Sequence, residues 1–252
     1  MKKHFLFLAG LFILLSFNTL LAQAPPKKIV VENSDMVDIQ QTEVPGAVVY
    51  RGNVRLIHDG VRMACNVAYL FNKENYVKAF GDVKMNQGDT VFMDSKYAEY
   101  RGNTKFAFAT GNVVMRDPKM TLTTDTINFD RRIQQAYYTT YGTIKDQENT
   151  LKSKSGRYFL NDKKFQFLTA VTITNPKYVI KSNHLDYYSN SGHSYLFGPS
   201  TITSKENFIY TEKGFYDTKK NFAHFVKNSY IKYNNRLIEG DSLYYDLSLI
   251  HI

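Results

Sequence analysis

Carboxylates recur along the chain at intervals that would suit acid–base chemistry if they met in one cleft. Asp94, Asp125, Glu212 and Asp241 each follow a short run of alternating apolar residues. General acid–base catalysis needs two such groups with different pKa values side by side. A residue class that returns once per repeated unit is instead typical of turns, because Asp and Asn side chains bond nearby backbone groups. The spacing therefore favours a structural role over catalysis.

The other reactive side chains form no catalytic or metal-binding motif. The G-x-S-x-G, H-E-x-x-H, P-loop and C-x-x-C patterns do not occur in the sequence. Six histidines show no ligand spacing, and a predicted turn separates His184 from His193, which disfavours a metal site there. Cys65 is the single cysteine, so an intramolecular disulfide and a Cys-rich zinc site are excluded. We expect no enzyme activity, no catalytic residue, no cofactor and no metal.

The elements that must position these residues are β-strands. The 252 residues include 19 Tyr and 18 Phe, and such side chains fit a pleated, half-buried surface. An aromatic content of 15% is too high for a disordered chain. Fourteen glycines and six prolines exclude collagen-like and other low-complexity sequence. The length suits one elongated domain or two small ones.

A repeat with a period near 30 residues organises the chain. The tripeptide Gly-Asn-Val or Gly-Asp-Val begins at Gly52, Gly81 and Gly111. Isoleucines continue the series more weakly at Ile144, Ile173, Ile202 and Ile231. From Val54 onward the steps are 29, 30, 31, 29, 29 and 29 residues. Regular steps of this kind indicate stacked units, none of which can bury its apolar face alone.

Each unit changes the phase of its apolar alternation once. Leu122 lies at an odd distance before Asp125, whereas Ile127 and Phe129 lie two and four residues after it. A period-2 pattern that changes phase predicts a bulge or corner, at which the strand bends and keeps its apolar face inward. Cys65 occupies this corner position in the first unit, which favours a buried thiol. Pairing of the thiol with another chain in an oxidising compartment is the alternative.

The fold is expected to be all-β, an elongated, repeat-built jelly roll of two facing sheets joined by corners. The strands are too short and too regularly broken for one flat sheet. Seven units of two strands, spaced by about 4.8 Å, would stack to roughly 65 Å. An open sheet edge at each end would be available for pairing with another chain.

The N-terminal segment has the features of an export signal. Two lysines precede an apolar run over residues 5–15, and small residues end the segment at 22–24. An uncleaved membrane anchor is the alternative, and polar residues before position 20 weaken it. We expect residues 1–24 to be a signal peptide and residues 25–252 to form the mature domain. Loss of the two lysines lowers the formal net charge from +9 to +7.

The repeat resembles that of a known family. The Gly-Asn/Asp-Val-x-Met/Leu start, the corner acid, the aromatic strand ends and the period near 30 are similar to the organic-solvent-tolerance (OstA-like) repeat. That repeat is shared by LptA, LptC and the periplasmic part of LptD, which transport lipopolysaccharide. The resemblance covers about residues 30–252, is clearest around Gly81 and Gly111, and is degenerate around Gly142 and Val171. With seven units the chain resembles the longer OstA-like members of Bacteroidetes.

This resemblance implies a periplasmic protein whose slightly open jelly roll holds the lipid A acyl chains of lipopolysaccharide in an interior groove. It also implies edge-to-edge pairing with LptC-like or LptD-like proteins, or with itself, in a bridge from inner to outer membrane. The residues that match the inward pattern are Val54, Val83, Met85, Val113, Met115, Leu122, Ile127, Phe129, Ile173, Ile180, Tyr187, Ile202 and Tyr245. Such side chains could shield acyl chains from water, and each buried methylene would contribute about 0.8 kcal/mol. The same side chains equally suit a solid core that holds no lipid.

Several alternatives stay open on the sequence alone. The net charge of +7 fits lipid A phosphates or an anionic membrane face, and it equally fits a solvated surface, because basic and acidic residues are mixed along the chain. An exported scaffold or adhesin with a solid core is the main rival to a lipid carrier. A glycan-cleaving enzyme is disfavoured by the regular recurrence of the corner acids, and nucleic-acid binding by export. The seventh unit stops at Ile252 before its closing strand, so we expect the chain to be part of a longer protein.

Overall fold

A computed structural model describes residues 27–246 except positions 41, 147, 218 and 221. The described part is all-β, with eighteen strands and no helix, which confirms the predicted fold class. It therefore contains no helix long and apolar enough to cross a membrane. The predicted signal peptide at 1–24 and the chain after residue 246 lie outside the described residues.

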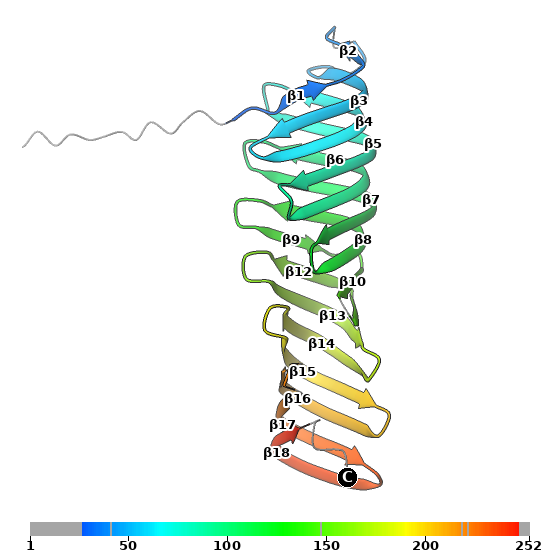
Figure 1. The fold of residues 1–252 in the computed structure, drawn as a ribbon, viewed down its shortest axis with the longest axis vertical. Coiled ribbons are helices and arrows are strands. Elements are labelled where there is room, and N and C mark those ends of the chain that lie inside the picture. Colours follow the sequence, from blue (N-terminus) through cyan, green and yellow to red (C-terminus); the bar gives the residue numbers. More distant parts are fainter. Residues whose placement is uncertain (1–26, 41, 147, 218, 221, 247–252) are drawn as a thin grey trace, which may run out of the picture.

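The strands follow one another along an elongated molecule (Figure 1). The N-terminal strands are β1 (Val30–Asn33), β2 (Met36–Asp38), β3 (Val48–His58), β4 (Val61–Phe71), β5 (Tyr76–Gln87), β6 (Val91–Arg101), β7 (Phe106–Asp117) and β8 (Met120–Asp130). Four short strands follow, β9 (Gln135–Tyr138), β10 (Gly142–Asp146), β11 (Asn149–Ser153) and β12 (Ser155–Phe159). The C-terminal strands are β13 (Lys164–Thr174), β14 (Tyr178–Tyr188), β15 (His193–Ser204), β16 (Asn207–Asp217), β17 (Phe222–Tyr233) and β18 (Arg236–Asp246).

Each long strand bends near its middle, so that the sheet folds into two facing leaves. Leaf A consists of the strand halves that meet at the turns after β3, β5, β7, β10, β13, β15 and β17. Leaf B consists of the halves that meet at the turns after β4, β6, β8, β12, β14 and β16. The two sheets predicted from the sequence are therefore one hydrogen-bonded sheet, because the antiparallel ladders continue on both sides of every bend. A bulge shifts the register by one residue and bends the strand without ending the ladder.

The Gly-Asn and Gly-Asp pairs of the repeat form the corners of the odd-numbered long strands. Gly52 and Asn53 both have positive φ, 72° and 48°, and the register between β3 and β4 shifts there. The degenerate fifth unit keeps this geometry without glycine, since Thr169 and Ala170 have φ of 63° and 53°. Two successive left-handed residues are unfavourable for side chains with a Cβ, which explains why Gly and Asx are used in the clearest units.

The bends of β16 and β18 include the predicted corner residues Glu212 and Asp241, whereas β4 and β6 bend next to the predicted residue. In β4 the register shifts between Ala64 and Val67, which places the exposed Asn66 in the bend. Cys65 lies before it, faces inward opposite Val54 and is 5% exposed, so its predicted burial is observed but its corner position is wrong by one residue. A bulge sets two residues against one, and alternation alone does not tell which of the two is the extra one.

Strand edges lie at both ends of the described sheet. β1 pairs with the leaf A half of β3 and β2 with the leaf B half, so together they form the first edge. At the other end β18 pairs, among the described strands, only with β17. Between these edges the inward side chains of both leaves form one apolar core that extends from Ile29 to Ile231.

Candidate functional site

The interior between the leaves contains all of the predicted groove residues. Eleven of them are buried in the shared apolar core, at 9% exposure or less: Val54, Val83, Met85, Val113, Met115, Leu122, Ile127, Phe129, Ile173, Ile180 and Tyr187. The remaining two, Ile202 and Tyr245, are partly buried against the same core. Their inward direction follows from the alternation of each strand. That they contact a lipid stays a prediction.

The inward side chains are more deeply buried at the N-terminal end than in the last described strand. Ile29 is 6% exposed over the first unit. In β18, Ile238 lies opposite the buried Ile231 and is 52% exposed. Leu243 and Tyr245 of the same strand are only partly buried.

Opposite the corners, the turns of the two leaves meet along a line that we call the seam. Inward aromatic residues of leaf B lie along it at steps of 29 residues: Tyr100, Phe129, Tyr158, Tyr187, Tyr216 and Tyr245. The hydroxyl of Tyr158 donates to Oδ2 of Asp117 on leaf A at 2.7 Å. Burial and this carboxylate raise the pKa of Tyr158, and burial and Asp146 raise that of Tyr187. These hydroxyls thus stay protonated at neutral pH and act as donors across the seam.

Toward the C-terminal end the seam contacts become neutral. The rings of Tyr178 on leaf A and Tyr216 on leaf B meet edge to face with 5.7 Å between their centroids. Burial raises the pKa of Tyr178 to about 12 and that of Tyr245 to about 12. The sequence reasoning found Phe129, Tyr187 and Tyr245 of this row but missed its other members, although the 29-residue step alone identifies them.

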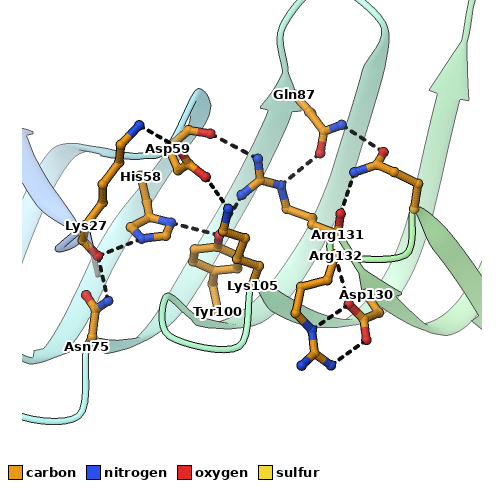
Figure 2. A network of polar contacts seen from close by, with 11 residues as sticks. Lys27, His58, Asp59, Asn75, Gln87, Tyr100, Lys105, Asp130, Arg131 and Arg132 are labelled. Carbon is orange, nitrogen blue, oxygen red and sulfur yellow. Dashed lines mark hydrogen bonds and ion pairs between the residues drawn. The ribbon is translucent and has the colours of Figure 1, made fainter. Parts of the chain in front are cut away.

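Charged side chains close the N-terminal end of the seam (Figure 2). The carboxylate of Asp59 accepts hydrogen bonds from Nζ of Lys27 at 2.7 Å and of Lys105 at 2.5 Å. These two lysines hold the pKa of Asp59 well below its usual range. The guanidinium of Arg131 donates to the Tyr100 hydroxyl at 2.8 Å and to the Asp59 carbonyl oxygen at 3.0 Å. Turns of both leaves from the first three units, and Lys27 before them, are joined in this way.

His58 lies inside this network and is 4% exposed. Its Nε2 is 2.9 Å from the Lys27 carbonyl oxygen and its Nδ1 is 2.9 Å from the Tyr100 hydroxyl. A neutral imidazole satisfies both contacts, because Nε2–H donates to the carbonyl and Nδ1 accepts from the tyrosine. Burial lowers the pKa of His58.

We expect His58 to make the protein less stable in mild acid. Its pKa is lower in the folded than in the unfolded state, so its stabilisation is present above the unfolded value of about 6.5 and is lost as the pH falls below it. The His58→Gln variant should therefore lose fewer degrees of melting temperature than wild type between pH 7.5 and pH 5.5. Thermal unfolding by circular dichroism measures this, with His224→Gln on the outer face of leaf B as control. Equal slopes for wild type and His58→Gln would contradict the assignment.

A second row of polar groups lines the corner side of the interior. It consists of small inward residues at steps of 29 or 30: Cys65, Ser95, Thr124, Ser153, Ser182 and Thr211. The Ser153 hydroxyl donates to the carbonyl of Ser155 at 2.9 Å and that of Thr211 to the carbonyl of Lys213 at 2.7 Å. Such bonds satisfy backbone carbonyls that the bend removes from the ladder. The sequence predicts a recurring polar residue in the bend and a buried Cys65, but not the other members of this inward row.

Cys65 takes part in the same pattern. Its Sγ lies 3.3 Å from the Val67 carbonyl oxygen. Burial raises the pKa of the Cys65 thiol to about 11. Because the thiolate is the reactive form, Cys65 is unreactive near neutral pH.

The histidines considered as metal ligands lie elsewhere, on the outer face of leaf B. Nε2 of His184 is 3.2 Å from Asp186 and Nε2 of His193 is 3.5 Å from Asp217. Within the part of the chain that the structure describes, no three His, Cys, Asp or Glu side chains are grouped to hold a metal.

Comparison with known proteins places the chain in a family. Residues 26–183 match the family of OstA-like proteins. No curated protein matches the chain. Among solved structures, LptH from Pseudomonas aeruginosa, described as the LptA-homologous periplasmic component of the lipopolysaccharide transport device, is similar at 11% identity and a TM-score of 0.40. That alignment covers 42% of this chain and 81% of LptH. Since the family match spans more than half of the 252 residues, the chain belongs to the OstA-like protein family.

Proposed function

We propose that the protein binds lipopolysaccharide in the periplasm and carries or bridges it from the inner to the outer membrane, without chemistry of its own. The observation that carries this proposal is the continuous apolar interior, which runs along the molecule between the two leaves. Membership of the OstA-like family supports it. The proposal includes export by the signal segment at 1–24.

The two-leaf fold suits an amphiphile of this shape. Acyl chains placed between the leaves would contact Val, Ile, Met and Phe side chains, at about 0.8 kcal/mol per buried methylene. Sugars and phosphates would remain outside, beyond the polar seam. The inward side chains of the two leaves contact one another, so acyl chains enter only where the leaves separate. The neutral C-terminal part of the seam is the place where separation breaks the fewest charged contacts.

The partners proposed for the protein are other OstA-like chains, either LptC-like or LptD-like proteins or further copies of itself. β18 and the first edge, formed by β1 and β2, have backbone groups available for adding a strand. Pairing at β18 would also cover Leu237 and Ile238, which are 53% and 52% exposed.

Photo-crosslinking in cells tests the cargo. A photoreactive amino acid at Met115 or Phe129, both inward, should attach lipopolysaccharide to the full chain. The same amino acid at Val114 or Asn128, the outward neighbours on the same strands, should give only background. Equal labelling from inward and outward positions would contradict an interior site.

A structural protein with a solid core is the second candidate. The dense burial of the N-terminal interior favours it, since Val54, Val83 and Met115 are 1% exposed or less. It predicts no lipopolysaccharide on either inward position, so the same experiment separates the two candidates.

A further inference from the structure

The outer faces of the two leaves differ in chemistry. On leaf A an inward row of apolar residues passes through eight strands from β8 to β17: Leu122, Ile144, Leu151, Ile173, Ile180, Ile202, Ile209 and Ile231. The residues on either side of each member therefore point outward. These sixteen residues, which we call the Thr/Lys face, are Thr121, Thr123, Thr143, Lys145, Thr150, Lys152, Thr172, Thr174, Val179, Lys181, Thr201, Thr203, Phe208, Tyr210, Tyr230 and Lys232.

This face holds four lysines and eight threonines and contains no acidic residue. Lys145, Lys152 and Lys181 are exposed, and none of them has an ion pair within the described part of the chain. The acids of leaf A's outer surface border this face: Asp125 and Glu212 lie at corners, and Glu148 and Glu206 lie in turns. Glu212 pairs with Lys227, and Asp94, beyond the end of the face, pairs with Arg116. With eight strands about 4.8 Å apart, the face extends over roughly 34 Å.

The outer face of leaf B has a different charge pattern. Lys78, Arg157 and Lys213 are basic there, but acids are interleaved with them. Asp186, for example, forms an ion pair with Lys164 at 2.6 Å. The basic surplus of the strands is therefore concentrated on one side of the molecule.

Aromatic rings occupy the C-terminal end of the Thr/Lys face. The ring centroids of Tyr210 and Tyr230 are 5.3 Å apart, and those of Phe208 and Tyr230 are 6.1 Å apart. Nζ of Lys232 lies 5.4 Å from the Tyr230 ring centroid. Tyrosine rings prefer the headgroup level of a bilayer, and lysines beside them are attracted by anionic lipids.

Two hollows open on the same face. One, of about 430 Å³, is lined by Thr172, Lys181, Thr201 and Tyr210 together with residues of the adjacent corners. The other, of about 470 Å³, lies between the last two leaf A turns, where the acidic Glu206 lines it together with Lys232 and Arg236. The hollow at Lys181 has no acidic residue in its lining. Threonine hydroxyls beside a lysine ammonium supply hydrogen-bond donors and positive charge for a phosphate group.

We propose that the Thr/Lys face docks on a bilayer that contains anionic phospholipids, with a headgroup phosphate in the hollow at Lys181. A surface with dispersed lysines suits a plane of charge, because lysine acts as a point charge and lacks the bidentate geometry of arginine. The tyrosines at one end add an interfacial contact that a soluble anion does not need. This site lies on the outer side of leaf A and is separate from the interior proposed for acyl chains.

Vesicle co-sedimentation with the full chain tests the proposal. Wild type should bind phosphatidylglycerol–phosphatidylethanolamine vesicles and leave phosphatidylcholine vesicles unbound, and 0.5 M salt, a concentration at which charges are screened within about 5 Å, should release it. The triple variant K145Q/K152Q/K181Q should bind about a hundredfold more weakly, since each lysine contributes about a factor of five at an anionic surface. The matched triple K78Q/R157Q/K213Q on leaf B removes the same charge and should stay within about threefold of wild type.

Several outcomes would overturn the proposal. It would be overturned if wild type did not bind the anionic vesicles or bound neutral vesicles equally well. It would also be overturned if the two triple variants lost the same amount of binding, because the loss would then depend only on net charge. Competition by inorganic phosphate at constant ionic strength would indicate a small-anion site and not a bilayer. The vesicles contain no lipopolysaccharide, so failure here leaves the cargo proposal intact, and circular dichroism checks that each variant is folded.

Discussion

Replacing Gly142 with alanine is expected to lower the free energy of unfolding by about 3 kcal/mol, the upper part of the range for overpacked cores. A Cβ on Gly142 would lie 2.4 Å and 2.5 Å from ring carbons of Tyr138, and a Cβ on Gly156 would lie 2.5 Å from its hydroxyl oxygen. The ring is 3% exposed, and its hydroxyl is 2.7 Å from Oγ of Ser153. It is therefore fixed between two strands and cannot move aside cheaply. Urea denaturation measures the loss.

A double-mutant cycle tests the cause of this loss. Tyr138→Ala alone should cost about 4 kcal/mol through the cavity it leaves. In that background Gly142→Ala should cost less than about 0.5 kcal/mol, because the ring it clashes with is gone. Additive losses would show that the glycine is needed for another reason.

Tyr138 and its glycines lie where the repeat departs most from its signature. The unit around Gly142 lacks the Gly-Asx-Val start, and here the long strands are broken into β9 and β10 and into β11 and β12. Before this point the inward residues of leaf B nearest the corner include Ala68, Ala79, Ala98 and Ala109, with Ile127 as the large exception. In the fourth unit Gly142 and Gly156 are small where the Tyr138 ring lies against them, so the unusual residues of this unit accommodate that ring.

The fold was predictable from sequence because its two strongest signals are local. Alternation identified the inward residues, and a change of phase identified the bends. The Gly-Asx pairs mark the start of each clear repeat unit, and such pairs are typical of turns between strands. In the structure Gly81 and Asp82 lie inside β5, which begins at Tyr76. A bulge and a turn use the same left-handed residues, so composition does not distinguish them.

The parts that sequence reasoning missed depend on contacts between distant units. Tyr158 meets Asp117 41 residues earlier, and this offset is set by the stagger between the leaves. Lys145, Lys152 and Lys181 likewise fall on one face only after the strands are aligned. In the linear sequence these lysines alternate with acids that lie on other faces, so the sequence alone shows no basic patch. The repeat period identifies the residues that form a row along one leaf. It does not identify the residues of the other leaf that this row contacts.

Linking the two leaves across the seam is expected to reduce lipopolysaccharide loading to less than about a tenth, as for a lid held shut. Nζ of Lys119 on a leaf A turn donates to Oδ1 of Asn190 on a leaf B turn at 2.9 Å, and both residues are exposed. Cysteines at these two positions can be joined with a short bifunctional methanethiosulfonate reagent and released by reduction. The buried Cys65 thiol, with its pKa raised to about 11, does not compete for the reagent. Binding of fluorescent lipopolysaccharide to the purified protein measures loading.

The bridge is expected to reduce loading because it keeps the two leaves together. Acyl chains reach the interior only if the leaves part, and a covalent bridge on the seam prevents parting without filling the interior. The pair R157C/Q166C, joined across neighbouring strands within leaf B, should load like wild type with or without the reagent. Reduction should restore loading to the K119C/N190C variant. Normal loading of the bridged variant would contradict entry of acyl chains by separation of the leaves at the seam. Failure of both the unbridged variants and wild type to load would count against the lipid cargo itself.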